Sequence, residues 1–379
     1  MLGLVSLFMD ISSEMIHGLL PVFLVTTLGA SALAVGVIDG IAEGTASVMR
    51  LFSGIGSDRM RRRKPLTLIG YGLAALTKPL FPLAHSVLAV LVARFIDRIG
   101  KGIRTAPRDA LIADLTEPSQ RGAAFGLRQS LDTIGAVTGP LIAIALMQAL
   151  NDDMRFIFAL AVIPAFIAVA ILAFGVREPE RVTTGPAPRF DRAALRRLPK
   201  PFWLLIGVNI PFTLARFSEA FLILRAQSLG LTLALVPATL VVMNVAYTVT
   251  AYPAGKLSDR MSRVRLMAYG CLVLLAAQAC LGFGATLAWA AFGTALWGVH
   301  LGLTEGLIAA MVADHAPADL RGTAFGVLHL VRGVLLLAGS ALAGLLWTLE
   351  GPAAAFAAGG AFTLVTLMSL RAMPALRAH

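Results

Sequence analysis

The sequence predicts an all-α polytopic membrane protein with twelve transmembrane helices in two pseudo-symmetric bundles of six. Three observations predict this fold class: an apolar composition, a series of apolar segments of spanning length, and an internal repeat. Of 379 residues, 58% are hydrophobic and 14% are charged, and the mean hydropathy is +0.81. Soluble domains average about 45–50% apolar and 25% charged residues. The chain is therefore too apolar for a soluble protein.

Apolar segments long enough to cross a bilayer as helices account for most of the chain. A transmembrane helix needs about 20 predominantly apolar residues. Segments of this kind recur at about 2–29, 32–57, 66–84, 86–108, 122–149, 154–176, 201–228, 232–256, 266–284, 286–313, 322–349 and 352–373. The first segment has no basic stretch before it, so we expect a retained span and no cleaved leader.

The basic residues indicate the orientation. The net charge of +11 would suggest nucleic acid in a soluble protein. Here the Lys and Arg residues outside the segments follow even-numbered segments, including the twelfth. The loops after odd-numbered segments are nearly free of them. Loops rich in Lys and Arg stay in the cytoplasm. We therefore expect both termini to be cytoplasmic, a bacterial inner-membrane location and no nucleic-acid partner.

An internal repeat divides the chain into halves. Residues 121–126 (RGAAFG) recur as 321–326 (RGTAFG), and 57–60 (SDRM) recur as 258–261. The polar stretch 177–200 lies between the copies, so we expect bundles at 1–176 and 201–379 joined by a cytoplasmic linker. Six helices per copy gives a parallel repeat, and such folds bind substrate near the midplane between their halves.

A loop motif gives the family resemblance. Residues 54–64 (GIGSDRMRRRK) follow the second segment, and 255–265 (GKLSDRMSRVR) follow the eighth. In these stretches and over its whole length, the chain resembles the major facilitator superfamily. The resemblance implies that Asp58, and less firmly Asp259, helps to lock an outward-facing state by pairing with cytoplasmic helix ends. The alternative is a topology-setting basic loop with a solvated Asp. The motif residues are Gly54, Asp58, Arg59, Arg62, Gly255, Asp259 and Arg260.

The fifth segment carries a second motif, Gly135, Gly139 and Pro140. It is similar to the core of a motif typical of antiporters in this superfamily, although the trailing glycine pair of that motif is absent. Glycines four residues apart let helices approach closely. The resemblance favours export, and generic helix packing is the alternative.

Ionisable residues inside the first span are the strongest functional signal. Asp10, Glu14 and His17 fall within about 60° of one another on a helix. A charge at mid-bilayer costs on the order of 3 kcal/mol unless it is paired, protonated or hydrated. This face of the helix must therefore look into protein or into a water-filled cavity.

Further ionisable or polar residues lie at similar depth in other spans. They are Asp39, Glu43, Arg94, Asp97, Arg98, Asp132, Arg216, Glu219, Asn244, Glu305, His329 and Arg332. A carboxyl group buried in a membrane can bind and release a proton near neutral pH. Glu14 and Glu43 are the first candidates for the coupling proton, followed by Asp10 and Asp39, with His17 and Glu219 as other cavity residues. The alternative for these acids is a static ion pair with Arg94 or Arg98.

The fourth segment departs from the family pattern. Asp97 and Arg98 stand where Gln and Gly are usual, and Arg94, Arg98 and Lys101 begin a cationic stripe. Arg94, Asp97 and Arg98 either pair with acids of the first, second and fifth spans or offer charge to an anionic substrate. We favour pairing, because acids are present in those spans.

These observations predict a monomeric secondary transporter of a small solute that works by alternating access. We expect proton-coupled antiport, with efflux of an organic compound, and contacts with protons and membrane lipids. Three alternatives stay open: organic-anion uptake or exchange through the arginines of the fourth span, divalent metal transport, and a non-transporting sensor or scaffold. The sequence holds no nucleotide-binding or catalytic signature. We therefore expect no cofactor and no enzymatic activity.

Overall fold

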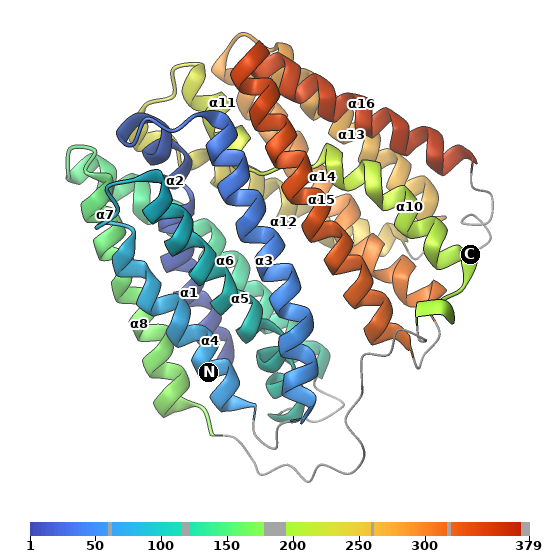
Figure 1. The fold of residues 1–379 in the computed structure, drawn as a ribbon, viewed down its shortest axis with the longest axis horizontal. Coiled ribbons are helices and arrows are strands. Elements are labelled where there is room, and N and C mark those ends of the chain that lie inside the picture. Colours follow the sequence, from blue (N-terminus) through green and yellow to red (C-terminus); the bar gives the residue numbers. More distant parts are fainter. Residues whose placement is uncertain (60–62, 116–120, 178–194, 259–260, 317–319, 373–379) are drawn as a thin grey trace. The chain divides into compact units, whose positions relative to one another are not determined.

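The computed structural model confirms the all-α class, with no strand among the residues it describes (Figure 1). It describes the chain except for 60–62, 116–120, 178–194, 259–260, 317–319 and 373–379. In the first half the helices are α1 (Leu2–His17), α2 (Leu20–Val22), η1 (Phe23–Thr27), α3 (Ala32–Arg59), α4 (Lys64–Thr77), η2 (Lys78–Leu80), α5 (Val87–Leu115), α6 (Arg121–Ala149), α7 (Met154–Leu160), α8 (Val162–Ala170) and η4 (Ile171–Gly175).

The described residues of the second half contain eight more helical elements. These are α10 (Lys200–Ala215), α11 (Ala220–Ser228), η5 (Leu233–Leu235), α12 (Ala238–Ser258), α13 (Arg263–Phe283), α14 (Leu287–His315), α15 (Arg321–Glu350) and α16 (Pro352–Ala372). Joined end to end where they are consecutive, the elements of both halves follow the twelve predicted segments. α5 is longer than predicted, because Pro107 is accommodated inside the helix.

Ten of these helices among the described residues are long and apolar enough to cross a membrane. The other two predicted spans are α4 and α5. α4 has only 14 residues before it continues into η2. α5 is long enough, but it carries Arg94, Asp97, Arg98 and Lys101 in the part where a span should be apolar. Such charges need partners inside the protein.

The chain forms two compact units. Unit 1 comprises Met1–Ala30, Ile41–Arg189 and Leu233–Ala238, and unit 2 comprises Ser31–Gly40, Phe190–Thr232 and Thr239–His379. The units follow the two halves of the repeat, except that the start of α3 groups with unit 2 and the residues around η5 group with unit 1. The linker predicted at 177–200 lies mostly outside the described residues.

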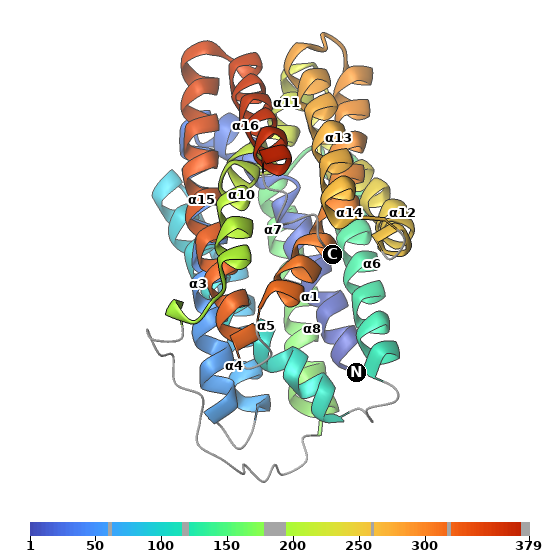
Figure 2. The same ribbon diagram turned by 90° about the vertical axis from the view of Figure 1, so that its right-hand side faces the viewer.

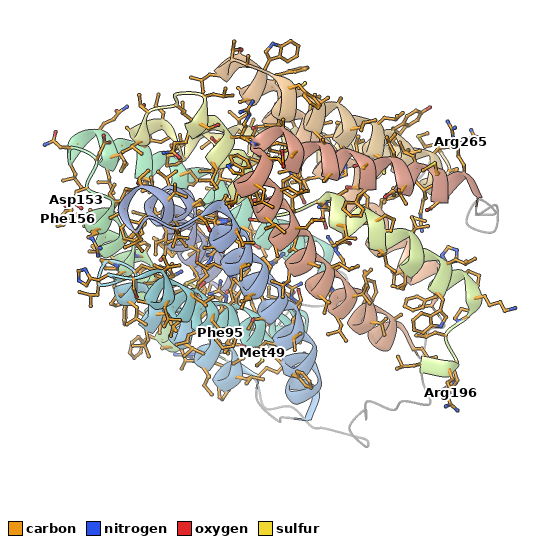
Figure 3. All side chains as sticks on the ribbon, turned by 45° about the horizontal axis from the view of Figure 1, so that its top comes forward. Met49, Phe95, Asp153, Phe156, Arg196 and Arg265 are labelled. Carbon is orange, nitrogen blue, oxygen red and sulfur yellow. The ribbon has the colours of Figure 1, made fainter. Side chains whose placement is uncertain are left out.

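In unit 1, α1 lies against α6 and α8, and α4 lies against α5 (Figures 1 and 2). Buried apolar side chains of α1, α4 and α8, such as Val5, Tyr71 and Ala165, form its core. The α7 helix begins at Asp153, whose carboxylate accepts a hydrogen bond from the Phe156 backbone N–H at 3.1 Å (Figure 3). A capping side chain of this kind satisfies a helix N–H that has no partner inside the helix.

In unit 2, α13 packs against α14 and α16, and α10 packs against α15 and α16. Its core contains Phe202, Phe212, Met267, Ile308 and Leu328. The charged heads of Arg196 and Arg265 point away from this unit (Figure 3).

The first and seventh spans are both interrupted. α1 ends at His17 and α2 begins at Leu20, because Pro21 has no backbone N–H to donate to the His17 carbonyl. Gly18 and Leu19, between the two helices, keep right-handed helical dihedral angles. α10 ends at Ala215, and Arg216 takes a non-helical conformation (φ −105°, ψ 58°) before α11 begins. Interrupted helices at membrane depth are typical of transporter binding sites.

Candidate functional site

The acidic face of α1 packs against the glycine motif of α6. A methyl group placed on Gly135 would lie 2.9 Å from the Asp10 Cβ, and one placed on Gly139 would lie 2.8 Å from the Glu14 Cβ. Only glycine therefore fits at either position without moving α1. Pro140 is buried in the same helix, which continues through it. The α6 motif thus brings the helix backbone up to the two carboxylate-bearing residues.

Asp10 and Glu14 differ in their partners. Glu14 faces His17 one turn later, with 3.5 Å between Glu14 Oε2 and His17 Nδ1. Asp10 makes no hydrogen bond and no ion pair with any residue that the structure describes. The charged groups near it are Asp132 of α6 and the α5 side chains Lys101, Arg104 and Arg108.

A chain of alternating charges connects α5 to three other elements of unit 1. Arg98 Nη1 lies 3.1 Å from Glu43 Oε1 of α3, as the pairing interpretation of the fourth span predicts. Asp97 Oδ1 accepts a hydrogen bond from Lys78 Nζ of η2 at 3.0 Å. Lys78 also donates to Ser13 Oγ of α1 at 3.0 Å. These contacts bring α1, α3, η2 and α5 together.

Lys78 is the one member of this chain that the sequence interpretation missed. Its side chain is 2% exposed, which makes it one of the most buried large side chains in the protein. The sequence contained a signal for this residue, since Lys78 is the only charged residue in the predicted span 66–84. A buried lysine needs a counter-charge, and Asp97 supplies it.

Two further cations of α5, Arg104 and Arg108, bind within unit 1. Arg94 is buried. The Arg104 guanidinium lies over the Tyr71 ring at 4.4 Å, and Arg108 donates to Ser6 Oγ of α1 at 3.0 Å. In α6, Arg128 Nη1 donates to Asp132 Oδ2 at 2.6 Å. The lower part of the cationic stripe therefore fastens α5 to α1 and α4.

Unit 2 holds a different arrangement. Glu305 of α14 accepts hydrogen bonds from both Arg216 and Arg332, the latter at 2.9 Å. Arg216 lies at the interruption after α10, and its guanidinium lies 5.1 Å from the centroid of the Phe212 ring. Glu305 thus joins α10, α14 and α15 through one carboxylate with two cations.

Four other predicted site residues, Asp39, Glu219, His329 and Asn244, also belong to unit 2. Asp39 Oδ2 accepts a hydrogen bond from Ser218 Oγ at 2.6 Å. Glu219 stands at the start of α11, His329 is half-buried on α15, and Asn244 is half-buried on α12. The repeat places Arg332 at the position of Asp132, but each is paired inside its own unit, with Glu305 and Arg128 respectively.

The loop motifs can be placed only in part. Gly54 lies in α3 and Gly255 in α12. The side chains of Asp58 and Arg59, and the whole of Arg62, Asp259 and Arg260, lie outside the described residues. Their gating role stays a prediction. In the part of the chain that is described, no group of three His, Cys, Asp or Glu side chains could hold a metal ion.

Ionisable groups inside apolar spans and a twofold sequence repeat are typical of membrane transporters. The model of the Major Facilitator Superfamily matches residues 2–340 and 220–377. The chain belongs to this family of membrane transporters for small solutes, and it is a multi-pass membrane protein. This confirms the resemblance seen in the loop motifs.

Similar proteins agree with this assignment. An uncharacterized MFS-type transporter of Methanocaldococcus jannaschii is 31% identical over 97% of this chain and 92% of its own length. Multidrug resistance protein MdtH of Cronobacter sakazakii is 32% identical over 34% of this chain and 32% of its own length. A POT family transporter in complex with 5-aminolevulinic acid shares the fold, with a TM-score of 0.82 and 14% identity over 99% of this chain and 96% of that one.

Proposed function

We propose that the protein is a proton-coupled antiporter that exports a small organic compound, and that acids of α1 carry the proton. The basic loops are proposed to lie on the cytoplasmic side, as the loop charges predict. The observation that carries the proposal is the environment of Asp10. It is a membrane-embedded carboxyl group that has no hydrogen-bond or ion-pair partner among the described residues.

The physical reason is the cost of an isolated charge in a membrane. Burial without a direct ion-pair or hydrogen-bond partner disfavours the charged form of a carboxyl group, so such a group can take up a proton. Glu14 supports the same role, because the His17 imidazole lies 3.5 Å from its carboxylate and can relay a proton to or from it. Glu43 ranked with Glu14 in the sequence analysis. Its contact with Arg98 favours the charged form, so we assign the proton to Asp10 and Glu14 instead.

Export of an organic compound is supported by two further features. The α6 glycines resemble the antiporter motif, and they contact the two acids of α1. The MdtH relative is named for multidrug resistance, and its similarity covers 34% of this chain.

Substrate-driven proton flux in proteoliposomes tests the proposal. Vesicles with a trapped pH dye are given ethidium and a panel of other hydrophobic cations and weak bases. Wild type should move protons against the substrate, and Asp10→Asn and Glu14→Gln should abolish this flux while exchange of labelled substrate across the membrane continues. Asp153→Asn is the matched control, because Asn caps a helix as well as Asp does. Unchanged proton flux in both α1 variants would overturn the assignment.

A second candidate function is uptake or exchange of an organic anion. It is favoured by Lys101 of α5, which is half-buried and makes no hydrogen bond or ion pair with a described residue. An anionic substrate would supply a direct ion-pair partner for Lys101. If this function is correct, Lys101→Gln should lose transport of organic anions in the same vesicles, and organic cations should not drive proton flux.

A further inference from the structure

Two carboxylates compete for the Arg98 guanidinium. Its Nη1 lies 3.1 Å from Glu43 Oε1, while its Nε lies 3.8 Å from Asp97 Oδ2. The second distance exceeds the hydrogen-bond range. Asp97 precedes Arg98 in α5 and is 6% exposed, whereas the Glu43 side chain is 37% exposed. By burial alone, Asp97 needs the cation more than Glu43 does.

Lys78 explains why Arg98 nevertheless pairs with Glu43. Its ammonium lies 3.0 Å from Asp97 Oδ1, and Ser13 Oγ accepts a second hydrogen bond from it at 3.0 Å. The Lys78 ammonium of η2 therefore balances the charge of Asp97. Arg98 Nε stays 3.8 Å from the other Asp97 oxygen and forms no hydrogen bond with it. The planar guanidinium is left to bind Glu43 of α3.

We propose that Lys78 is a positioning residue for the Arg98–Glu43 ion pair, and that it excludes Glu43 from the acids that carry protons. Without the Lys78 charge, Asp97 would be a buried carboxylate with Arg98 as its nearest cation. A short rotation of the guanidinium would pair the two, and Glu43 would lose its partner. Lys78 thereby limits the number of protons that unit 1 takes up. This inference rests on the proposed proton coupling.

Other charges act on the same two acids. Glu43 faces Arg94 and Lys101 of α5 and His17 of α1 in addition to Arg98. Asp97 faces Arg94 besides Lys78 and Arg98. These groups remain in place when Lys78 is changed. A change in Glu43 protonation therefore reports the movement of Arg98.

Infrared titration of the reconstituted protein tests the inference. The carboxylic C=O band of Glu43 is identified as the band that Glu43→Gln removes. In Lys78→Met we expect this band to appear at a pH about 1–3 units higher than in wild type, the range that one neighbouring cation accounts for. Lys78→Arg keeps the charge and should titrate as wild type does.

A rescue variant separates positioning from general damage. In Lys78→Met with Asp97→Asn, position 97 carries no charge to draw Arg98 away from Glu43, so the Glu43 band should return to the wild-type midpoint. An unshifted midpoint in Lys78→Met, or a double variant that keeps the shifted midpoint, would overturn the inference. If Lys78→Met does not fold, the Glu43 midpoint in the single variant Asp97→Asn tests the inference. Its midpoint should equal or lie below that of wild type, and a rise would contradict the account.

The titration needs no substrate and no proton gradient. Its outcome is therefore independent of whether the protein is an antiporter. If wild type shows no substrate-driven proton flux, antiport is wrong. The infrared midpoints still report which acid Arg98 binds.

Discussion

The two units treat their membrane-embedded acids in opposite ways. In unit 2, one carboxylate, Glu305, accepts hydrogen bonds from two cations, Arg216 and Arg332. In unit 1, Asp10 has no such donor among the described residues, and Glu14 has only a histidine. An acid held by two arginines is stabilised in its charged form, whereas an acid without a direct ion pair to an arginine is less strongly held in that form. We therefore assign the proposed proton coupling to unit 1.

The repeat sharpens this comparison, because the two units interrupt related spans in the same place. Unit 1 leaves Glu14 and His17 before the interruption between α1 and α2. Unit 2 has Arg216 in the interruption between α10 and α11, where it binds Glu305. The backbone between α1 and α2 stays helical, whereas Arg216 after α10 does not, so the related spans present different groups in different local conformations.

The largest expected effect on stability comes from Glu305→Gln. Removing one partner of a buried ion pair typically costs 3–5 kcal/mol. Because Glu305 is 33% exposed, we expect the lower end, about 3 kcal/mol of the free energy of unfolding. Asp10→Asn removes an acid without an ion-pair partner among the described residues, and it should cost much less. Unfolding of the purified proteins in mild detergent measures both. Equal losses in the two variants would remove the distinction between the units.

A smaller effect is expected at the glycines that contact the acids of α1. Gly139→Ala places a methyl group 2.8 Å from Glu14 Cβ and from Ile11 O, so α1 must shift. Overpacking of this kind costs about 1–3 kcal/mol. The matched control is Gly72→Ala in α4, where no atom lies within 4 Å of the added methyl group. Thermal midpoints should fall in the first variant and stay or rise in the second. A loss of stability in Gly72→Ala equal to that in Gly139→Ala would contradict the packing account.

The smallest effects should separate the two arginines of unit 2. Arg332→Lys keeps the charge on a side chain that is 25% exposed and should cost about 0.5 kcal/mol. Arg216→Lys also loses the contact with the Phe212 ring, so it should cost about 1–2 kcal/mol. The same unfolding measurement compares them. A larger loss in Arg332→Lys would mean that Arg332, and not Arg216, anchors Glu305.

Most of the architecture could be predicted from the sequence. Span length, loop charge and the repeat predicted the helices, and the 100° rotation per residue predicted the shared face of Asp10, Glu14 and His17. The pairing of Arg98 with an acid of the second span was expected because acids were available there. These properties depend on residue order and on local geometry.

The choice of partners could not be predicted in the same way. Asp97 binds Lys78, a residue outside the predicted candidates, and Asp132 binds Arg128 of its own helix. The candidate ranking placed Glu43 before Asp10, although among the described residues Glu43 makes a direct ion pair with an arginine and Asp10 does not. Each outcome depends on distances of a few ångströms between helices far apart in sequence. Spacing along one helix does not determine those distances.

The most direct test counts the protons released when substrate binds. Calorimetry with ethidium, or with the panel compound that binds best, is run in buffers of different ionisation enthalpy. Linkage predicts release of about one proton per substrate bound in wild type and in Glu305→Gln, and none in Asp10→Asn. Release that persists in Asp10→Asn and disappears in Glu305→Gln would place the proton in unit 2 and contradict the account.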